Sequence, residues 1–390
     1  MKFEMLEKQK MRILLVNTGD GIFDGVSQIE YNWWKTMPSS LISYDFLTLA
    51  SSTFGLYRQE LIDHGSVIFD FQDKRNRILR NLHFVNYLFN FFKANHYDIV
   101  HINSGMSLRS LIMLFVLKCF KVKVIFHAHS SVFEDDWKQK FFRKTLVYMF
   151  YHLSDLCIAV SKVSAYTFFP KKYVRNHQVK IINNGIDLPK FKFNVKDRKI
   201  LRSNYQIKEN DLLIGFIGRF IYQKNPEFVA RIFLNLSKQN KRAKLLMIGE
   251  GPLKEKVLSI LAQPLRERKV IMMNDVTDIA RYYQMLDILL MPSRFEGLPL
   301  VAVEAQASGL NLIVSKKITR EVIVNKSVYR LDADKDCDIN RWVDQIDMIF
   351  NLRSENRLSE FKQLQKSKFS QKNFDKKIIS FYYRLLRRSK

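Results

Sequence analysis

Short apolar runs alternate with longer amphipathic segments along most of this chain, and this alternation restricts its fold more than any other feature. Runs such as Arg12–Asn17, Tyr97–Ile102 and Leu156–Ser161 are rich in aliphatic residues, which indicates buried strands. Segments with helical periodicity, such as Leu108–Cys119, separate them. Strands that alternate with helices form mostly parallel sheets with helices packed on their faces. The sequence therefore predicts an α/β protein.

The same alternation continues through both halves of the 390 residues, a length that suits two domains. Strands are expected at 12–17, 44–49, 66–69, 97–102, 121–126, 156–161, 179–182, 211–217, 243–249, 269–273, 287–292 and 311–315. Helices are expected at 27–37, 75–95, 108–119, 136–152, 225–240, 279–285, 299–308, 340–352 and 358–387. The polar, basic stretch Lys190–Asn204 is expected to be an interdomain linker with a short helix, and strand signals fade beyond Val322.

One strand–loop–helix segment in the second half has the features of an anion-binding site. The apolar run Asp287–Pro292 predicts a buried strand, Pro299 suits the first turn of a helix, and Gly309 is a typical helix end. Backbone N–H groups at such a helix start attract anions. Glu296 and Glu304 bracket the segment at the carboxyl end of the strand, where open α/β sheets bind ligands. They could accept hydrogen bonds from sugar hydroxyls, or they could be a solvated loop acid and a helix-dipole acid.

Two cations occupy a similar position after the strand 211–217. Arg219 follows the strand directly, and Lys224 precedes Asn225-Pro226, where a helix is expected to begin. A guanidinium and an ammonium group placed there can together neutralise a diphosphate. The alternative is that both are surface cations, which are common in a chain this basic.

These segments carry a resemblance to a known family. The sequence F-E-G-L-P-L-V-A-V-E-A, which includes Glu296 and Glu304, resembles the E-x7-E signature of retaining glycosyltransferases of family 4. Gly218-Arg219 with Lys224-Asn225 resembles the G-R-x-x-x-x-K-N segment of the same family. The run from Val179 to Val322 resembles the capsular and exopolysaccharide branch, and the first half resembles it more weakly.

The resemblance implies the GT-B fold, in which two doubly wound Rossmann-like domains face each other across a cleft. Residues 1–190 would form the acceptor-binding domain and residues 191–365 the nucleotide-sugar-binding domain. Residues 366–390 would form a helix that crosses back to the first domain. The implied reaction is the transfer of a sugar, with retention, from a nucleotide-diphosphate sugar, most simply a UDP-sugar.

The resemblance also implies roles for the motif residues. Glu304 would bind the donor ribose, while Glu296 and the amides of Gly297 and Leu298 would hold the sugar and its phosphate. The site would need no metal cofactor, because the sequence has no convincing D-x-D motif and Asp332-Ala-Asp334 lies in the unmatched tail.

Arg219 and Lys224 would then stabilise the departing diphosphate in place of a metal ion.

Two features of the first half lie at expected strand ends. The loop Gly19–Gly25 contains glycines, a weak nucleotide or phosphate signal whose alternative is a plain turn. In the resembled family this loop carries adjacent glycines and Gly25 would contact the donor, but Asp24 takes the place of the first of them. His127 and His129 could be metal ligands or hydrogen-bonded histidines. The resemblance implies that such a residue lines the acceptor side, and His129 is preferred to His127 as a catalytic-site residue.

The formal net charge of +26 predicts an attraction to polyanions. The chain has no zinc-finger spacing or RNP-type motif, and its basic residues alternate with large apolar ones, which favours an anionic membrane surface over nucleic acid. The segment Asp136–His152 interleaves basic and aromatic residues and is the preferred membrane element, although a core helix with solvated lysines is as plausible. No segment reaches the roughly 20 apolar residues of a membrane span, and residues 1–10 lack a signal-peptide core.

The sequence thus predicts a cytoplasmic enzyme, peripherally bound to the inner face of the cell membrane, that glycosylates a lipid-linked oligosaccharide in surface polysaccharide synthesis. The alternatives are a nucleotide-sugar epimerase of the same fold, a basic nucleic-acid-binding module and an inactive scaffold. Three widely spaced cysteines, Cys119, Cys157 and Cys337, are expected to be small apolar residues.

Overall fold

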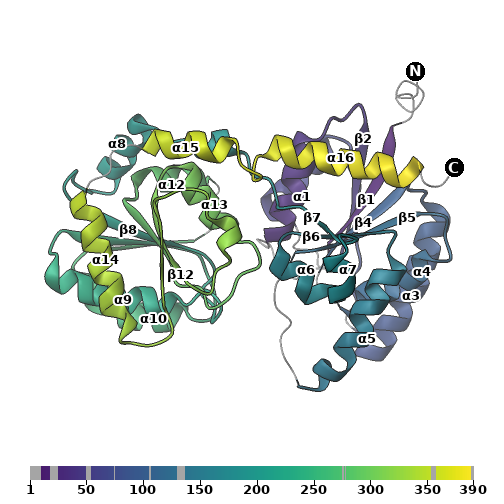
Figure 1. Cartoon of the computed structure of the whole chain (residues 1–390), viewed down its shortest axis with the longest axis horizontal. Helices are drawn as coiled ribbons and strands as arrows, with labels where there is room; N and C mark the ends of the chain where they lie inside the picture. The colour runs from purple at the N-terminus through teal and green to yellow at the C-terminus, as the bar shows by residue number, and fades with distance from the viewer. Residues whose placement is uncertain are drawn as a thin grey trace. The chain divides into compact units, whose positions relative to one another are not determined.

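A computed structural model describes residues 10–17, 25–49, 54–73, 75–104, 107–129, 137–274, 276, 278–352 and 357–387. The chain forms two compact units (Figure 1). The first comprises Met1–Gly185 together with Gln371–Lys390, and the second comprises Ile186–Ser370. The last helix therefore belongs to the same unit as the first half of the chain. Each unit is built on a parallel sheet, as the alternation of strands and helices predicts.

The first unit has a seven-stranded sheet in the order β3-β2-β1-β4-β5-β6-β7, and every strand pair is parallel. The strands are β1 Met11–Asn17, β2 Ile42–Thr48, β3 Ile68–Asp70, β4 Ile99–Ser104, β5 Lys123–Ala128, β6 Leu156–Ala159 and β7 Lys180–Ile181. The chain winds outward in one direction from β1 and in the other from β4. The loops after these two strands diverge, and such a point is where open α/β sheets bind ligands.

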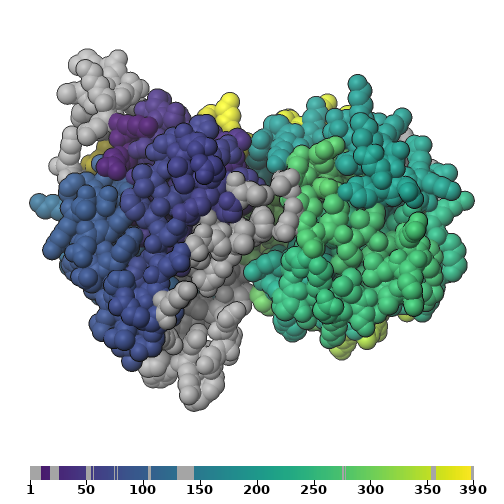
Figure 2. Space-filling model, turned by 180° about the vertical axis from the view of Figure 1, so that it is seen from behind, coloured from purple at the N-terminus to yellow at the C-terminus, as the bar shows by residue number. Residues whose placement is uncertain are grey.

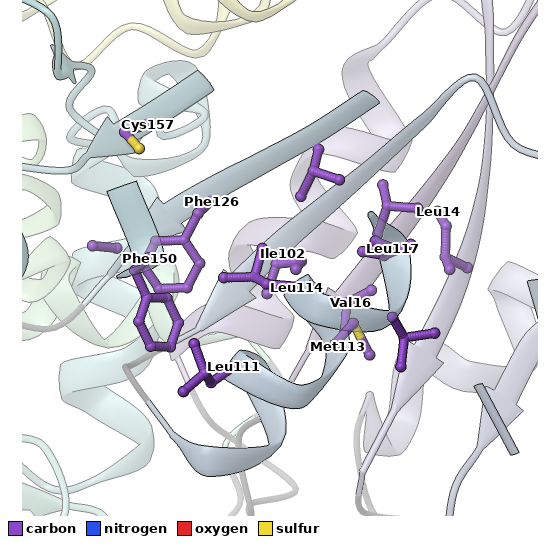
Figure 3. Packing of buried hydrophobic residues seen from close by; sticks show 14 of the residues in the cluster. Leu14, Val16, Ile102, Leu111, Met113, Leu114, Leu117, Phe126, Phe150 and Cys157 are labelled. Atoms are coloured by element: carbon purple, nitrogen blue, oxygen red, sulfur yellow. The ribbon is translucent and has the colours of Figure 1, made fainter. Parts of the chain in front are cut away.

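Helices cover both faces of this sheet (Figure 1). They are α1 Gly25–Thr36, α2 Arg58–Asp63, α3 Arg77–Ala94, α4 Leu108–Leu117, α5 Trp137–Leu153, α6 Lys162–Phe168, α7 Lys171–Arg175 and α16 Gln371–Arg387. Beneath α3, α4 and α5, a large apolar core joins strand residues such as Val16 and Ile102 to Leu114 and Phe150 (Figure 3). On the other face, Trp33 of α1 stacks on Phe374 of α16 with ring centroids 5.0 Å apart.

The second unit has a six-stranded parallel sheet in the order β10-β9-β8-β11-β12-β13. The strands are β8 Leu212–Ile217, β9 Ala243–Ile248, β10 Val270–Met273, β11 Ile288–Met291, β12 Asn311–Ser315 and β13 Val328–Leu331. The strand order reverses between β8 and β11. The loops that leave these two strands therefore carry this unit's expected ligand site.

Two groups of helices sandwich the second sheet (Figure 1). One face is covered by α9 Pro226–Gln239, α10 Lys254–Ile260 and α14 Asp338–Leu352, and the other by α8 Val195–Asn204, α12 Ile279–Met285, α13 Leu300–Ala307 and α15 Arg357–Gln365. The short helix α11 Ala262–Arg266 precedes β10. Phe228 and Trp342 pack edge to face between α9 and α14, with ring centroids 5.7 Å apart. Among the helices that the structure describes, none is long and apolar enough to cross a membrane.

The stretch expected to be a linker is instead part of the second unit. Its helix α8 packs against α12, and Arg202 is only 4% exposed. Arg198 and Arg202 bind the carboxylate of Asp287 at 2.5 and 3.2 Å, and both donate to the backbone carbonyl of Met285. The short helix expected in this stretch is confirmed as α8, but the stretch is not a free linker, because its arginines donate to the backbone carbonyls at the end of α12.

Other elements also differ from the sequence expectations, among them several short helices. Strand β13 was not predicted, because its residues are all partly exposed and it lies at the sheet edge. The helix expected at 358–387 is broken between α15 and α16, where Ile186 pairs with residues 369–370. Strand β5 extends to Ala128, so His127 lies inside the sheet and only His129 follows it.

The cysteine prediction holds for one residue only. Cys157 is buried in the core of the first unit, and burial raises the pKa of its thiol. Cys119 and Cys337 are exposed and are therefore not core residues.

We predict that Ile378→Ala, on the buried face of α16, destabilises the first unit by about 2–5 kcal/mol, because it leaves a cavity in a packed core. Ile378 is fully buried, whereas Lys376 two residues earlier is exposed, so Lys376→Ala is the matched control. Hydrogen exchange resolved by peptide measures the effect. Faster exchange confined to the second unit would show that α16 does not stabilise the first.

Candidate functional site

The two sequence motifs of the second unit meet where its strand order reverses. The loop after β8 contains Arg219 and Lys224, and the loop after β11 contains Glu296. Because β8 and β11 are neighbours in a parallel sheet, their carboxyl ends lie at the same edge and bring these loops together. The two motifs, which are far apart in the sequence, therefore lie together at one edge of the second sheet.

Lys224 and Glu296 form a buried ion pair between the two loops. Lys224 Nζ donates to Glu296 Oε1 at 2.5 Å, and the two side chains are 18% and 7% exposed. The neighbouring Gln223 Nε2 donates to the carbonyl of Phe295 at 3.1 Å. An ion pair held this far from water interacts more strongly than one on the surface, and it fixes the position of the ammonium group.

Asn225 holds the loop after β8 against the loop after β11. It adopts a left-handed conformation with φ of 57°, which asparagine tolerates better than most residues, and is 1% exposed. Its Nδ2 lies 3.4 Å from the carbonyl of Pro292, and its Oδ1 accepts from Arg294 Nη2 at 3.1 Å. Arg294 also lies over the ring of Tyr222, 4.4 Å from its centroid. Arg294 and Tyr222 were not singled out from the sequence, because their role depends on contacts between loops.

The loop after β9 completes this edge of the sheet, and two glycines allow it to approach closely. A side chain at Gly249 would meet the carbonyl oxygen of Gly218 at 2.1 Å, and one at Gly251 would meet that of Phe220 at 2.5 Å. Both have positive φ. These glycines therefore let the loop that carries Glu250 pack directly against the loop that carries Arg219.

Helix α13 begins where the sequence predicts a helix start. Pro299 is its N-cap and Gly309, with φ of 63°, follows its end. Among the described residues, the amides of Gly297 and Leu298 have no hydrogen-bond acceptor. Free N–H groups beside a helix N-terminus are suited to a phosphate.

Glu304, on the first turns of α13, is held by a residue that the sequence did not indicate. Tyr283 on α12 is fully buried and donates its hydroxyl to Glu304 Oε2 at 2.7 Å. Burial raises the pKa of the Glu304 carboxyl, and the Tyr283 hydrogen bond opposes that rise only in part. The arrangement leaves Oε1 available for another donor.

Arg219 differs from Lys224 in its exposure. Its side chain is exposed and has no ion-pair or hydrogen-bond partner among the described residues, so its charge is available to a ligand. In the part of the chain that the structure describes, no group of three or more His, Cys, Asp or Glu residues is placed to hold a metal ion.

In the first unit, His129 belongs to a buried polar network at the ends of β1, β4 and β5. His129 Nε2 donates to Asn103 Oδ1 at 3.0 Å. Asn103 and Asn17 donate to the two carboxylate oxygens of Glu30 at 2.8 and 3.0 Å. The sequence marks Asn17 and Asn103 only as polar residues at the ends of neighbouring strands. It gives no indication of Glu30 on α1.

The imidazole of His129 is neutral. Burial lowers its pKa to about 3, and its Nδ1 atom has no hydrogen-bond partner among the described residues. Since Nε2 carries the proton, Nδ1 is an acceptor. His127 is fully buried beside His101, whereas His129 follows the end of β5. Gly25 is the first residue of α1, and the rest of its predicted loop lies outside the described residues.

Family models match both halves of the chain. The model of glycosyl transferases group 1 matches residues 197–387, and that of glycosyltransferase family 4 matches residues 44–190. Each match lies largely within one of the two units of the fold.

Relatives and solved structures point the same way. The EpsF protein of Bacillus subtilis is 27% identical over 305 residues, which cover 76% of this chain and 77% of that protein. The UDP-Gal:alpha-D-GlcNAc-diphosphoundecaprenol alpha-1,3-galactosyltransferase of Escherichia coli is 25% identical over 58% of this chain and 60% of its own length. The structure of Anabaena HepE in complex with UDP and glucose has a TM-score of 0.74 at 15% identity, and covers 96% of this chain and 99% of that one. The fold is GT-B.

We predict that Glu304→Gln removes a pH dependence of stability. Ionising a carboxyl whose pKa is raised in the folded state costs stability. The wild type is therefore most stable below the pKa of the unfolded state, and it loses stability as pH rises through the pKa of the folded state. The melting temperature of the variant minus that of the wild type should therefore increase between pH 4 and pH 8. The control is Glu255→Gln, which changes an exposed glutamate. Equal shifts in both variants would contradict a buried carboxyl at position 304.

Proposed function

The chain belongs to the family 4 type of glycosyltransferases, and we propose that it transfers a sugar from a UDP-sugar, with retention of configuration, to a lipid-linked oligosaccharide in surface polysaccharide synthesis. The observation that carries this proposal is the pairing of Lys224 with Glu296 where the second sheet reverses its strand order. A cation fixed beside a carboxylate and free amides can hold both ends of a sugar–diphosphate bond.

Each motif residue has a task in this proposal. The diphosphate lies at the start of α13, where the amides of Gly297 and Leu298 donate to it. Lys224, released in part from Glu296, and the exposed Arg219 stabilise the charge that develops as the diphosphate leaves.

Glu296 then has a free oxygen with which to accept hydrogen bonds from sugar hydroxyls. Glu304, oriented by Tyr283, accepts hydrogen bonds from the two ribose hydroxyls. In this scheme the cations take the place of a metal ion, so catalysis is metal-independent.

The choice of UDP and of a lipid-linked acceptor rests on the relatives. HepE has a structure in complex with UDP and glucose, and the Escherichia coli relative uses UDP-Gal and a diphosphoundecaprenol acceptor by name. The proposal places the acceptor beside His129, which follows the end of β5 and has a neutral imidazole. That histidine orients the acceptor without carrying a charge.

An anionic membrane surface is the proposed source of the acceptor, and α3 and α4 are the proposed contact. Ile78 and Leu82 on α3 are 74% and 63% exposed, and Leu108 on α4 is 49% exposed. Both helices follow strands and so begin at the carboxyl edge of the first sheet, the edge that carries His129. Figure 2 shows the surface of this part of the first unit in blue.

Exposed apolar residues beside basic ones are typical of a surface that lies on lipid. This proposal gives the enzyme a cytoplasmic, peripheral location at the inner membrane face.

The sequence alone favoured α5 for this contact. Side chains of residues 137–144, which carry most of its basic and aromatic pattern, lie outside the described part of the structure. In the rest of α5, Val147 and Phe150 are buried in the core. The described residues therefore support α3 and α4 more strongly.

We predict that Lys224→Met lowers kcat with a UDP-sugar by about 10²–10³-fold, which is the usual cost of removing one charge-stabilising group. We also predict that EDTA does not change the kcat of the wild type. Thermal stabilisation by a panel of nucleotide sugars identifies the donor, and NMR of the product gives its anomeric configuration. Lys238→Met, an exposed lysine on α9, is the control. The melting temperature of Lys224→Met separates lost chemistry from destabilisation by the unpaired carboxylate of Glu296.

Three outcomes would overturn this proposal. Conversion of the nucleotide sugar to its epimer without transfer would favour the epimerase. Strong, salt-dependent duplex binding without any nucleotide-sugar stabilisation would favour nucleic acid. An inverted anomer would leave a transferase but reject retention.

We predict that Ile78→Glu/Leu82→Glu weakens binding to anionic phospholipid vesicles at least tenfold, because it removes apolar burial and adds repulsion. Cosedimentation with vesicles of phosphatidylglycerol measures it. The matched control, Met348→Glu/Leu352→Glu on α14, changes two residues of the second unit that are 51% and 66% exposed. Equal losses in both variants would mean that net charge alone governs binding, and no loss in either would exclude α3.

A further inference from the structure

Glu30 on α1 is a fully buried glutamate that takes no part in the sequence motifs or in the proposed reaction. It lies where the strand order of the first sheet reverses, at the ends of β1 and β4. Asn17 and Asn103 are register partners at these two strand ends, and each donates its side-chain amide to one oxygen of Glu30, at 3.0 and 2.8 Å. Glu30 therefore ties together polar residues at the edge of the sheet where open α/β folds bind ligands.

The carboxylate of Glu30 determines which way the amide of Asn103 faces. An ionised carboxylate accepts hydrogen bonds and cannot donate them, so it requires the NH₂ group of the amide on its side. The reverse orientation of Asn103 would place its amide oxygen against Glu30 Oε1, with two buried acceptors in contact and no proton between them. The amide oxygen of Asn103 is therefore directed away from Glu30.

The orientation of Asn103 in turn selects the tautomer of His129. Asn103 Oδ1 lies 3.0 Å from His129 Nε2, and an amide oxygen can only accept, so Nε2 carries the proton. A neutral imidazole has one N–H group, which leaves Nδ1 without a proton. The position of the proton on His129 thus follows from a carboxylate that is two hydrogen bonds away.

An amide between the two groups transmits this orientation without charging the imidazole. A carboxylate in direct contact with a histidine favours the imidazolium form and raises the pKa of the histidine. Here burial lowers the pKa of His129 to about 3, and burial also lowers the pKa of His127. The arrangement therefore gives a neutral ring with a fixed proton position.

The other neighbour of this imidazole has its own hydrogen-bond partner. The ring centroid of His127 lies 4.2 Å from that of His129, and His127 Nδ1 lies 3.3 Å from His101 Nε2. His101 Nδ1 lies 2.8 Å from the hydroxyl of Tyr382 on α16. Among the described residues, Asn103 is the hydrogen-bond partner of the His129 imidazole, so Asn103 decides its tautomer.

We propose that Glu30 is a positioning residue for the acceptor side of the site, which acts through Asn103 to hold His129 in its Nε2–H tautomer. This inference rests on the proposed function only in that His129 lines the acceptor side. Burying a carboxylate costs free energy, and a carboxylate differs from an amide of the same shape in having no donor. A glutamine at position 30 can face Asn103 with its oxygen or with its nitrogen, so it allows both orientations of Asn103.

The test is the tautomer of His129 in Glu30→Gln, measured in the full chain by NMR correlation of the imidazole nitrogens with the ring protons. We expect the wild type to show the Nε2–H tautomer alone and the variant to show a mixture of both tautomers. Glu30→Met, which has no polar group at this position, should give the same mixture, and His129→Gln assigns the signal. Glu60→Gln is the control, because Glu60 lies on α2 of the same unit and bonds to Tyr31.

The melting temperature of each variant shows whether it is folded. A folded Glu30→Gln protein in which His129 keeps the Nε2–H tautomer alone would overturn the proposal. A mixture in Glu60→Gln as well would overturn it too, because the tautomer would then depend on the stability of the unit and not on Glu30.

Kinetics link the tautomer to the reaction. The probes are UDP-Gal and GlcNAc-diphosphoundecaprenol, which the name of the Escherichia coli relative gives as its substrates. We expect kcat/KM for the acceptor to fall roughly tenfold in Glu30→Gln, because a misoriented group costs rate, while the KM for UDP-Gal stays that of the wild type. Mixed tautomers with unchanged acceptor kinetics would reject the positioning role. Absence of transfer by the wild type would count against the proposed function, and the tautomer would still decide what Glu30 does.

Discussion

The buried ion pair between Lys224 and Glu296 is the interaction on which the candidate site depends. Replacing such a pair by apolar residues is often neutral or stabilising, so stability alone does not explain its presence. The two residues come from loops after different strands, and their bond fixes the distance between those loops. Asn225 and Gln223 tie the same loops through backbone carbonyls, so the ammonium group is held by its neighbours as well as by its partner. In the proposed reaction, a diphosphate would replace part of the bond between this positioned ammonium group and Glu296.

The two units apply one topological rule with different chemistry. In both sheets the strand order reverses at a central pair, and polar residues gather at the carboxyl ends of those strands. In the first unit, burial keeps the imidazole of His129 neutral, and its Nε2 donates to Asn103, which in turn donates to the carboxylate of Glu30. In the second unit, the same place holds the cations Lys224 and Arg219 together with free amides. Imidazole and amide groups suit hydroxyl groups, and cations with free amides suit phosphates.

The sequence predicted those parts of the site that are local along the chain. Lys224, Glu296 and Glu304 follow strands or begin helices, so strand and helix signals were enough to place them. Tyr283 was beyond reach, because only the packing of α12 against α13 brings its hydroxyl to Glu304. Likewise Arg198 appeared to be a linker residue, although it binds a carboxylate 89 positions away. Elements were predicted best where they are central and buried. Strand β13 was missed because an edge strand with partly exposed residues has no continuous apolar run.

Positively charged side chains of the second unit lie at both ends of its sheet. Their different environments determine how much of the net charge of +26 is available to a polyanion. At the carboxyl end, Lys224 is paired and Arg219 is exposed. At the amino end, Arg202 and Arg357 are turned inward, bonded to carbonyl groups, and lie beside one carboxylate. Cations held in this way cannot follow the evenly spaced phosphates of a nucleic acid backbone, since binding to that backbone needs accessible side chains. The buried arginines therefore add to the formal net charge without adding to a surface that attracts polyanions.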